Sequence, residues 1–263
     1  MKNSNFNLEK KLFSEGYEIV IGVDEAGRGP LAGPVVACAA ALRTPLGHSM
    51  SKSREWDLVR DSKKLSEKQR EKVFDFVCEN FYIGIGICDH KTVDRINILE
   101  ASFLAMKKAI ASLKREITND KFPMTNQIQN PNEKNFKNTK YNIQNTWYII
   151  LVDGNKKIPN FSMEQMTVVG GDRIVKSISA ASIIAKVTRD RTMLSMHKKY
   201  PVYGFDHHKG YGTKLHMDAL KKHGPCEIHR QSFAPVTRLA PASPSLGGST
   251  MRLCESRRGN FHK

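Results

Sequence analysis

Two adjacent carboxylates, Asp24 and Glu25, stand in a glycine-rich turn directly after an apolar run. The run, residues 18–23, is short and rich in β-branched residues, which predicts a buried strand that ends at Asp24. Glycines on both sides of Arg28 allow the chain to leave the strand, so both acids can face one centre. The guanidinium of Arg28 adds a fork of donors suited to phosphate. Together these residue types predict an active site for a phosphate-bearing substrate.

Two further acids follow short apolar runs far along the chain. Asp153 ends the run 147–152, and Asp172 follows two glycines after the run 166–169. An Asp before a glycine, as at Asp153, is by itself equally consistent with a turn. A fold can gather such acids into one cluster, which calls for divalent cations because like charges raise one another's pKa. Oxygen ligands favour Mg²⁺ or Mn²⁺ over zinc, and two such ions can support hydrolysis of a phosphodiester.

The chain of 263 residues is strongly basic, with 42 Lys and Arg against 26 Asp and Glu and a net charge of +16. This excess predicts a polyanionic partner, and composition alone does not separate nucleic acid from an anionic membrane surface. Residues 1–13 lack an apolar core of signal-peptide length, and no run of about 18 apolar residues occurs. We therefore expect a soluble, cytoplasmic protein without a membrane partner. Five scattered cysteines without a Cys-x-x-Cys pair predict reduced thiols.

The pattern of apolar residues predicts one α/β core around these acids. Residues 34–42 are small and apolar, which suits a second strand in a hairpin with the first. Residues 82–87 alternate apolar residues with glycine, which predicts a strand with one face very close to another element. Ser66 begins a capping box before a helix, and apolar positions spaced by three and four predict one amphipathic helix over 93–117. The small-residue segment 177–190 is compatible with a helix packed closely on a sheet.

Several polar residues allow either a structural or a functional interpretation. The loop 207–213 is basic, aromatic and glycine-bearing, so it could stack on a sugar or a base. A zinc site that joins its histidines to His216 and Cys226 is the competing interpretation, although their spacing matches no standard ligand pairing. Asp190 is more typical of an ion-paired helix residue than of a ligand, and Asn97 is an unassigned polar candidate. The serines of the small-residue segment either contact phosphate or simply pack.

Two stretches fall outside the predicted core. Residues 118–146 are rich in asparagine and lysine and poor in aliphatic residues, which predicts an exposed insertion. Residues 238–263 contain Pro, Ser, Gly and Arg with little periodicity, which predicts a flexible basic tail.

The sequence around Asp24 resembles the signature of the ribonuclease HII family, and six further blocks are similar to that family's landmarks in the same order. The seven blocks are residues 23–34, 61–66, 152–154, 171–172, 180–190, 208–211 and 229–233. The resemblance covers about residues 17–237, which defines one catalytic domain with an N-terminal extension, residues 1–16. The insertion is longer than the family leads us to expect, and Gly212 stands where proline often follows the tyrosine. Neither departure removes one of the four acids.

The resemblance implies a ribonuclease H-like α/β fold, with a mixed central sheet flanked by helices and a small helical C-terminal part. It implies an endonuclease that cleaves the RNA strand of RNA/DNA hybrids and incises ribonucleotide-containing duplex DNA 5′ of a single ribonucleotide. The products would carry 5′-phosphate and 3′-hydroxyl ends. The implied cofactors are divalent ions, Mn²⁺ or Mg²⁺, and the acids implied to bind them and to catalyse are Asp24, Glu25, Asp153 and Asp172. No short motif for a protein partner stands out, and we expect a monomer.

The same resemblance implies how the substrate is contacted. Tyr211 corresponds to a residue that stacks on the deoxyribose after the ribonucleotide. Ser62 and Lys63, which alone would be interpreted as polar residues before a helix, correspond to phosphate contacts. Only a group that touches the 2′-hydroxyl can tell RNA from DNA at one position. In the family that contact comes from a glycine-flanked backbone, which here is Gly27, Arg28 and Gly29.

The sequence leaves two rival interpretations open. The sister family, ribonuclease HIII, has a signature similar to Asp-Glu-Val-Gly-Thr-Gly, whereas residues 24–29 are Asp-Glu-Ala-Gly-Arg-Gly. The other rival is a basic, non-catalytic protein that binds nucleic acid and merely kept the fold. The presence of all four acids argues against this second rival.

Overall fold

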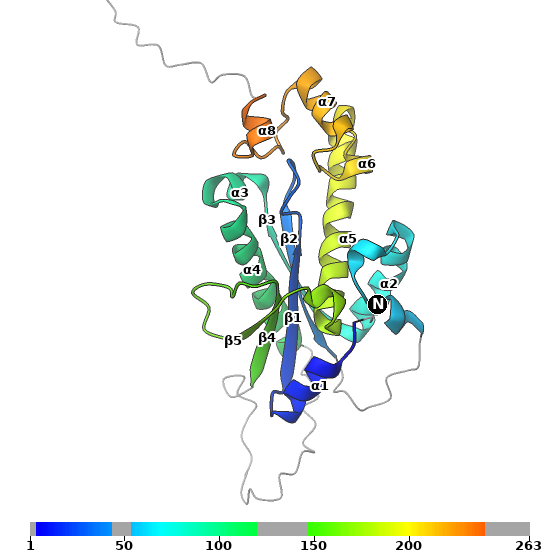
Figure 1. The fold of residues 1–263 in the computed structure, drawn as a ribbon, viewed down its shortest axis with the longest axis vertical. Coiled ribbons are helices and arrows are strands. Elements are labelled where there is room, and N and C mark those ends of the chain that lie inside the picture. The colour runs from blue at the N-terminus through cyan, green and yellow to red at the C-terminus, as the bar shows by residue number, and fades with distance from the viewer. Residues whose placement is uncertain (1–3, 44–53, 120–146, 240–263) are drawn as a thin grey trace, which may run out of the picture.

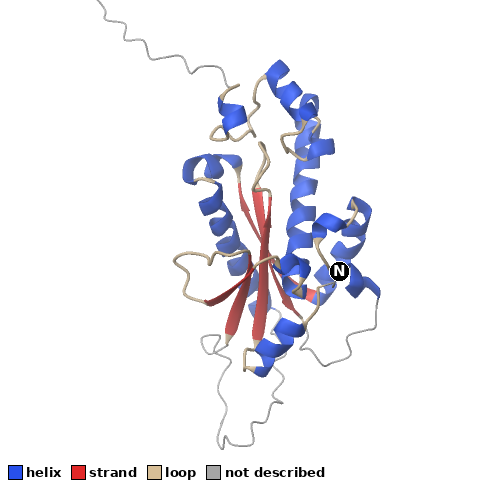
Figure 2. Ribbon diagram, in the orientation of Figure 1, coloured by secondary structure: helices blue, strands red, loops and turns tan. Residues whose placement is uncertain are grey.

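A five-stranded mixed sheet forms the centre of the molecule, with helices on both of its faces (Figure 1, Figure 2). The computed structural model describes residues 4–43, 54–119 and 147–239. The strands lie in the order β3-β2-β1-β4-β5. Their bounds are β1 Ile19–Ala26, β2 Val35–Leu42, β3 Phe81–Cys88, β4 Tyr148–Asp153 and β5 Glu164–Val168. This architecture confirms the predicted α/β fold with a mixed sheet.

The strand β1 lies at the centre of the sheet and pairs in both senses. It is antiparallel to β2, with Asp24 opposite Cys38, which confirms the predicted hairpin. It is parallel to β4, with Val23 opposite Val152. Outside this central trio, β3 pairs antiparallel with β2 and β5 pairs parallel with β4. The carboxyl ends of β1, β4 and β5 therefore meet at one edge of the sheet.

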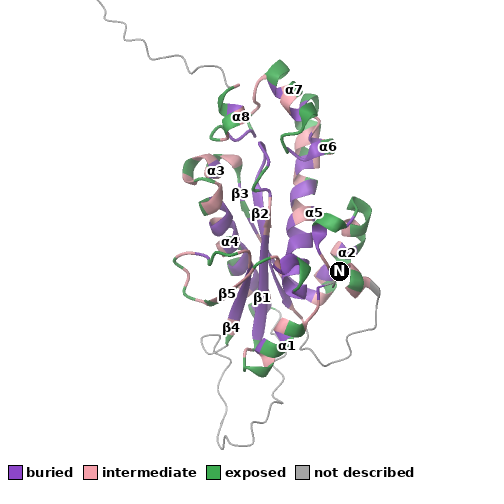
Figure 3. Ribbon diagram, viewed as in Figure 1, coloured by how far each residue is buried: buried purple, intermediate pink, exposed green. Residues whose placement is uncertain are grey.

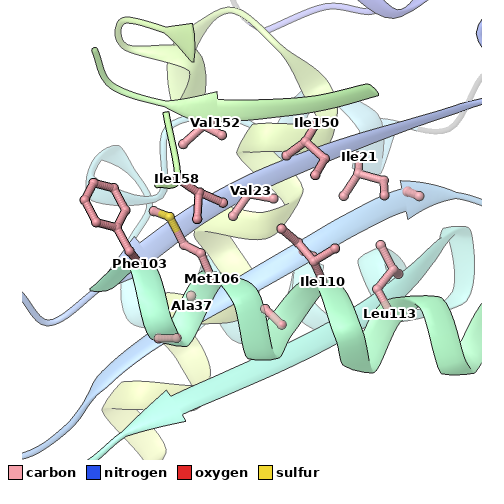
Figure 4. Packing of buried hydrophobic residues seen from close by; sticks show 14 of the residues in the cluster. Ile21, Val23, Ala37, Phe103, Met106, Ile110, Leu113, Ile150, Val152 and Ile158 are labelled. Atoms are coloured by element: carbon pink, nitrogen blue, oxygen red, sulfur yellow. The ribbon is translucent and has the colours of Figure 1, made fainter. Parts of the chain in front are cut away.

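Two long helices sandwich the sheet and bury both of its faces. The helix α4 (Ile98–Asn119) covers one face, and Figure 4 shows Met106 and Ile110 of this helix near Val23 and Val152. The helix α5 (Lys176–Lys199) covers the other face, with α2 (Glu67–Asn80) beside it. The central strands are accordingly buried along most of their length (Figure 3).

Shorter elements complete the structure. The helices α6, α7 and α8 gather near the end of α5 that lies beyond the sheet (Figure 1), as the predicted small helical C-terminal part. The remaining helices are α1 Asn7–Ser14, α3 His90–Ile96, α6 Phe205–His208, α7 Lys214–His223 and α8 Ala234–Thr237. The 3₁₀ turns are η1 Arg54–Leu58, η2 Ser62–Lys64, η4 Gly171–Arg173 and η5 Pro201–Tyr203.

The single amphipathic helix predicted over 93–117 is wrong, because the chain breaks at Asn97 into α3 and α4. Asn97 has a positive φ of 65°, which ends α3. Its side-chain oxygen then accepts hydrogen bonds from the N–H groups of Leu99 and Glu100, at 2.9 and 3.1 Å, and so caps the start of α4. The apolar spacing continues across the break, so periodicity alone does not reveal it. The predicted capping box at Ser66 is confirmed at the start of α2.

Glycine in β3 allows α4 to lie in direct backbone contact with the sheet. A Cβ atom on Gly84 would lie 2.1 Å from the carbonyl oxygen of Ala109, and one on Gly86 would lie 2.0 Å from that of Ala105. No side chain fits at such distances. The close approach predicted from the alternation of glycine in residues 82–87 is therefore confirmed.

The described part of the predicted N-terminal extension packs against the central sheet and α5. In α1, Leu12 is buried in a cluster with Val20 of β1 and Ile149 of β4. The carboxylate of Glu9 accepts hydrogen bonds from the backbone N–H and the hydroxyl of Ser177, at 2.9 and 3.0 Å. The predicted insertion and tail fall almost wholly outside the described residues. No helix in the described ranges is long and apolar enough to cross a membrane.

Candidate active site

The pairing of β1 with β4 places Asp24 beside Asp153. Val23 and Val152 are register partners, and both point into the core under α4. Because side chains alternate along a strand, the next residue on each strand points to the opposite face, toward α5. The two acids therefore meet at the carboxyl ends of neighbouring parallel strands.

Asp24 is buried, with 5% of its surface exposed. One carboxylate oxygen accepts the backbone N–H of Glu25 at 2.7 Å, and the side chain also hydrogen-bonds Ser182 of α5. Burial raises the pKa of Asp24 well above its ordinary value, and the negative charges of Glu25 and Asp153 raise that pKa further. A positive charge near this carboxyl would instead lower the pKa of Asp24.

Glu25 and Asp153 flank Asp24 and are each held by one contact. The carboxylate of Glu25 lies 3.2 Å from the guanidinium of Arg28, yet burial outweighs this partner and raises the pKa of Glu25. One oxygen of Asp153 accepts the backbone N–H of Gly171 at 2.7 Å. The pKa of Asp153 is raised by burial and by the neighbouring charge of Asp172.

Asp172 joins this group from the 3₁₀ turn η4 and is 4% exposed. The ammonium of Lys63 lies 3.3 Å from one of its carboxylate oxygens. Partial burial disfavours the charged form of Lys63, but the charge and hydrogen bond of Asp172 prevail and raise the pKa of Lys63. Lys63 is thus a cation held at the acid cluster by η2.

Two serines connect η2 to the acids on the α5 side. The hydroxyls of Ser62 and Ser182 lie 2.9 Å apart, and Ser182 in turn hydrogen-bonds Asp24. Ser62 and Lys63 were predicted as substrate contacts, and the structure places both beside the acids. The serines of the segment 177–190 were predicted either to contact phosphate or to pack, and nothing in the sequence distinguished Ser182 from the others.

The four carboxylates are suitable ligands for hard divalent cations, although their oxygens do not converge on one point. In the described ranges, no group of three or more His, Cys, Asp or Glu side chains lies close enough to hold a metal ion. Lys63 and Arg28 instead provide the positive charge beside Asp172 and Glu25. Buried carboxylates that raise one another's pKa form a site in which a divalent cation would relieve the repulsion. All the donors are oxygens, which suits Mg²⁺ or Mn²⁺.

The loop after β1 and the loop that carries Tyr211 are in contact. A Cβ atom on Gly29 would lie 3.6 Å from a ring carbon of Tyr211, a residue that is 43% exposed. The backbone N–H of Leu31 donates to the carbonyl of Gly210 at 2.8 Å. The structure therefore brings the predicted backbone segment 27–29 and the predicted stacking residue side by side, close to Glu25.

The zinc interpretation is not supported by the geometry. The Nε2 atoms of His216 and His229 lie 3.0 Å apart, while the thiol of Cys226 lies 3.2 Å from the other ring nitrogen of His229. These donors do not point at a common centre. His207 instead faces Asp206, at 3.5 Å.

The interpretation of Asp190 as an ion-paired helix residue is confirmed. Its carboxylate lies 2.8 Å from the ammonium of Lys186 and 3.8 Å from the guanidinium of Arg70. Both partners lie in the layer formed by α2 and α5. Asp190 therefore pairs with the side chains of Lys186 and Arg70 and is not part of the group of four acids.

Comparison with known proteins agrees with this site. The family model described as Ribonuclease HII matches residues 21–236. A ribonuclease HII of Caldicellulosiruptor bescii is 45% identical over 229 residues, which span 87% of this chain and 92% of that protein. The solved ribonuclease H2 of Pyrococcus horikoshii OT3 is 26% identical, with a TM-score of 0.56 over 84% of this chain and 96% of that one. A solved Bst-RNase HIII in complex with Mn²⁺ has a TM-score of 0.58 at 16% identity, over 84% of this chain and 68% of that one. The family model and the level of identity separate the chain from the sister family, and the chain belongs to the ribonuclease HII family.

Proposed function

We propose that this ribonuclease HII, an enzyme that cleaves RNA in RNA/DNA hybrids, also incises duplex DNA 5′ of a single embedded ribonucleotide. The products carry 5′-phosphate and 3′-hydroxyl ends. The observation that carries this proposal is the contact between residues 27–29 and Tyr211, beside the carboxylates. It supports an arrangement in which the sugars on both sides of one phosphodiester are read together.

The backbone of residues 27–29 is suited to recognise the ribose. A 2′-hydroxyl is both donor and acceptor, and only a group in contact with it distinguishes RNA from DNA. Gly27 has a φ of 101°, a conformation that favours glycine, and this turns the backbone out of β1 next to Glu25. The exposed ring of Tyr211 offers a flat face on which the following deoxyribose can stack.

The acids support hydrolysis assisted by divalent cations. Asp24, Glu25, Asp153 and Asp172 would hold Mg²⁺ or Mn²⁺, which when bound supplies activation of water and stabilisation of the leaving oxygen. The Mn²⁺ complex of Bst-RNase HIII, a protein of the same fold, supports this choice of cofactor.

Residues next to the acids position the scissile strand. Lys63, held 3.3 Å from Asp172, presents a positive charge for a phosphate. The hydroxyl of Ser62 and the guanidinium of Arg28 add donors on either side of the acids. All these groups come from one chain, which supports a monomer as the active form.

Incubation with a DNA duplex that carries one ribonucleotide tests the proposal. In Mg²⁺ or Mn²⁺ we expect one cut 5′ of the ribonucleotide, and no cut in the same duplex made wholly of DNA. A continuous RNA/DNA hybrid serves as the positive control for activity. Cleavage of the hybrid without incision of the single-ribonucleotide duplex under either metal would refute the proposal that the enzyme recognises a single ribonucleotide in DNA. Binding of both substrates without cleavage of either would favour the non-catalytic rival.

A further inference from the structure

Two arginines near the substrate-reading loops are fully buried. Arg189 lies in α5 and Arg230 follows α7, and each has 0% of its surface exposed. Within the described ranges, every hydrogen bond of their guanidinium groups goes to a backbone carbonyl. A buried charge is unfavourable unless it is well hydrogen-bonded, and burial lowers the pKa of Arg230 to about 9. Such groups lower stability, and their contacts indicate what they provide in return.

Arg230 holds the carbonyls of the turn that follows β1. Its guanidinium donates to Gly27 at 2.6 Å, to Arg28 at 3.1 Å and to Gly33 at 3.0 Å. Two of these three carbonyls belong to the segment 27–29 that is proposed to contact the 2′-hydroxyl. Arg230 therefore fixes the orientation of peptide groups in that segment from its buried side.

Arg189 joins the same turn to the loop that carries Tyr211. It donates to Pro34 at 3.1 Å and to Ala32 at 3.2 Å on the β1–β2 side, and to Lys209 at 3.0 Å on the other side. Its guanidinium carbon lies 5.8 Å from the centre of the Tyr211 ring. Arg189 thus contacts both loops at the point where they meet.

Arg189 is packed tightly against the turn that follows β1. A Cβ atom on Gly27 would lie 2.3 Å from the Nε atom of Arg189, so the backbone at Gly27 rests directly on the guanidinium. Figure 1 shows the turn after β1 reaching toward α6, α7 and α8. Tyr211 lies between α6 and α7, Arg230 lies between α7 and α8, and both segments form hydrogen bonds with this turn.

We propose that Arg189 and Arg230 are positioning residues that set the spacing between residues 27–29 and Tyr211. Through this spacing they determine the preference for a junction between a ribonucleotide and a deoxyribonucleotide. This inference rests on the proposed function of those two loops. Neither arginine touches the substrate, because both are covered by the loops that they hold.

Arginine is required at these positions by the geometry of the contacts. A planar guanidinium presents five donors in a fixed fork, so one side chain can hold three carbonyls at once. The ammonium of lysine is a compact charge on a flexible stem and cannot reach carbonyls spread around the plane of a guanidinium. Arg189→Lys and Arg230→Lys therefore keep the charge but release part of each loop.

The test compares two substrates in several variants of the full chain. The substrates are a duplex with one ribonucleotide and a continuous RNA/DNA hybrid, and the measured quantity is the ratio of their kcat/KM values. We expect each lysine variant to lower this ratio by about 10-fold or more, because small errors in placement cost large factors in rate. Arg191→Lys is the matched control, since Arg191 lies on α5 too but pairs with Glu71 at the exposed surface. Its ratio should match that of the wild type.

Combination with Tyr211→Ala separates positioning from general stabilisation. If the arginines act through Tyr211, either lysine substitution should leave the ratio nearly unchanged when the tyrosine ring is already absent. Arg230→Gln is a second variant that removes the buried charge, keeps a planar donor group and should show the same loss of ratio. It keeps the test valid if the lysine variant does not fold.

The outcomes distinguish the two levels of inference. Equal loss on both substrates, or effects that simply multiply with that of Tyr211→Ala, would overturn the assignment of the arginines while leaving the proposed function intact. A wild-type enzyme that does not incise the single-ribonucleotide duplex would refute the proposed function and the junction role of the arginines together.

Discussion

Two buried histidines beneath the Tyr211 loop should make the protein lose stability as the pH falls. His216 and His229 are both 0% exposed, and their Nε2 atoms lie 3.0 Å apart. The backbone N–H of Cys226 donates to Nδ1 of His229 at 2.9 Å, so that His229 must carry its proton on Nε2 and donate to His216. His216 in turn donates from Nδ1 to the carbonyl of Tyr211 at 2.9 Å. An added proton on either ring would break one of these hydrogen bonds.

The direction of the pH effect follows from the pKa values. Burial lowers the pKa of His216 from its ordinary 6.5 to about 4, and burial together with the nearby His216 lowers that of His229 to about 4. Between these two pKa values the unfolded chain binds more protons than the folded one. The contribution to stability is therefore complete above pH 6.5 and is lost as the pH falls toward 4.

The expected size can be worked out from the same shift. For one histidine whose pKa falls from 6.5 to about 4, the free energy of unfolding decreases by roughly 2 kcal/mol between pH 7 and pH 5. Both histidines together give roughly 4 kcal/mol. The raised pKa values of Asp24 and Glu25 act in the opposite direction, because the folded state then binds the additional protons. A comparison between variants cancels this opposing contribution.

Urea unfolding of wild type and His216→Gln over a series of pH values measures the effect. The amide of Gln can accept from His229 but does not titrate, so the variant keeps one of the two contributions. Its deficit in free energy of unfolding should shrink by roughly 2 kcal/mol from pH 7 to pH 5. Leu215→Gln is the control, because Leu215 is exposed next to His216 and carries no titratable group, so its difference from wild type should stay constant. A deficit for His216→Gln that is the same at both pH values would refute the assignment of a neutral, buried pair.

Three further substitutions test other parts of the structure. Asp153→Asn should abolish cleavage while changing the affinity for duplex by less than about threefold, since it removes a charge from the acid cluster but no basic contact; normal turnover would refute its role as a metal ligand. Tyr211→Ala should reduce cleavage at a single ribonucleotide more than cleavage of a continuous hybrid, and equal loss on both substrates would show that the ring does not read the junction. Gly86→Ala should lower the free energy of unfolding by about 2 kcal/mol or more, because its Cβ would lie 2.0 Å from the carbonyl of Ala105; unchanged urea unfolding would contradict that close packing.

Local features of the fold could be predicted from the sequence where one short stretch contains the whole cause. The capping box at Ser66 and the glycine alternation of β3 are such cases, because each depends on residues a few positions apart. The break at Asn97 is different, since one residue with a positive φ interrupts a helix without disturbing its apolar spacing. The order of the strands is also not encoded locally, because it depends on which distant segments pair.

The residues of the candidate site also differ in whether the sequence could predict them. Asp24 and Asp153 could be predicted because an acid that ends an apolar strand is visible in the sequence. Arg189 and Arg230 could not, because a basic residue in a helix or loop normally indicates a solvated surface. Only the structure reveals that both are enclosed by carbonyls, and all of these except that of Lys209 come from a segment more than 150 residues away.

The groups proposed to catalyse cleavage and the groups proposed to recognise the junction are held by different parts of the fold. Asp24 and Asp153 are fixed by adjacent parallel strands in a sheet that both long helices cover. Residues 27–29 and Tyr211 are held instead by hydrogen bonds between the turn after β1 and the C-terminal helical part. Substitutions in that C-terminal part should therefore change which phosphodiester is chosen before they change how fast a bound one is cleaved. Substitutions under the sheet should have the opposite effect, because they move the acids and leave the reading loops tied to each other.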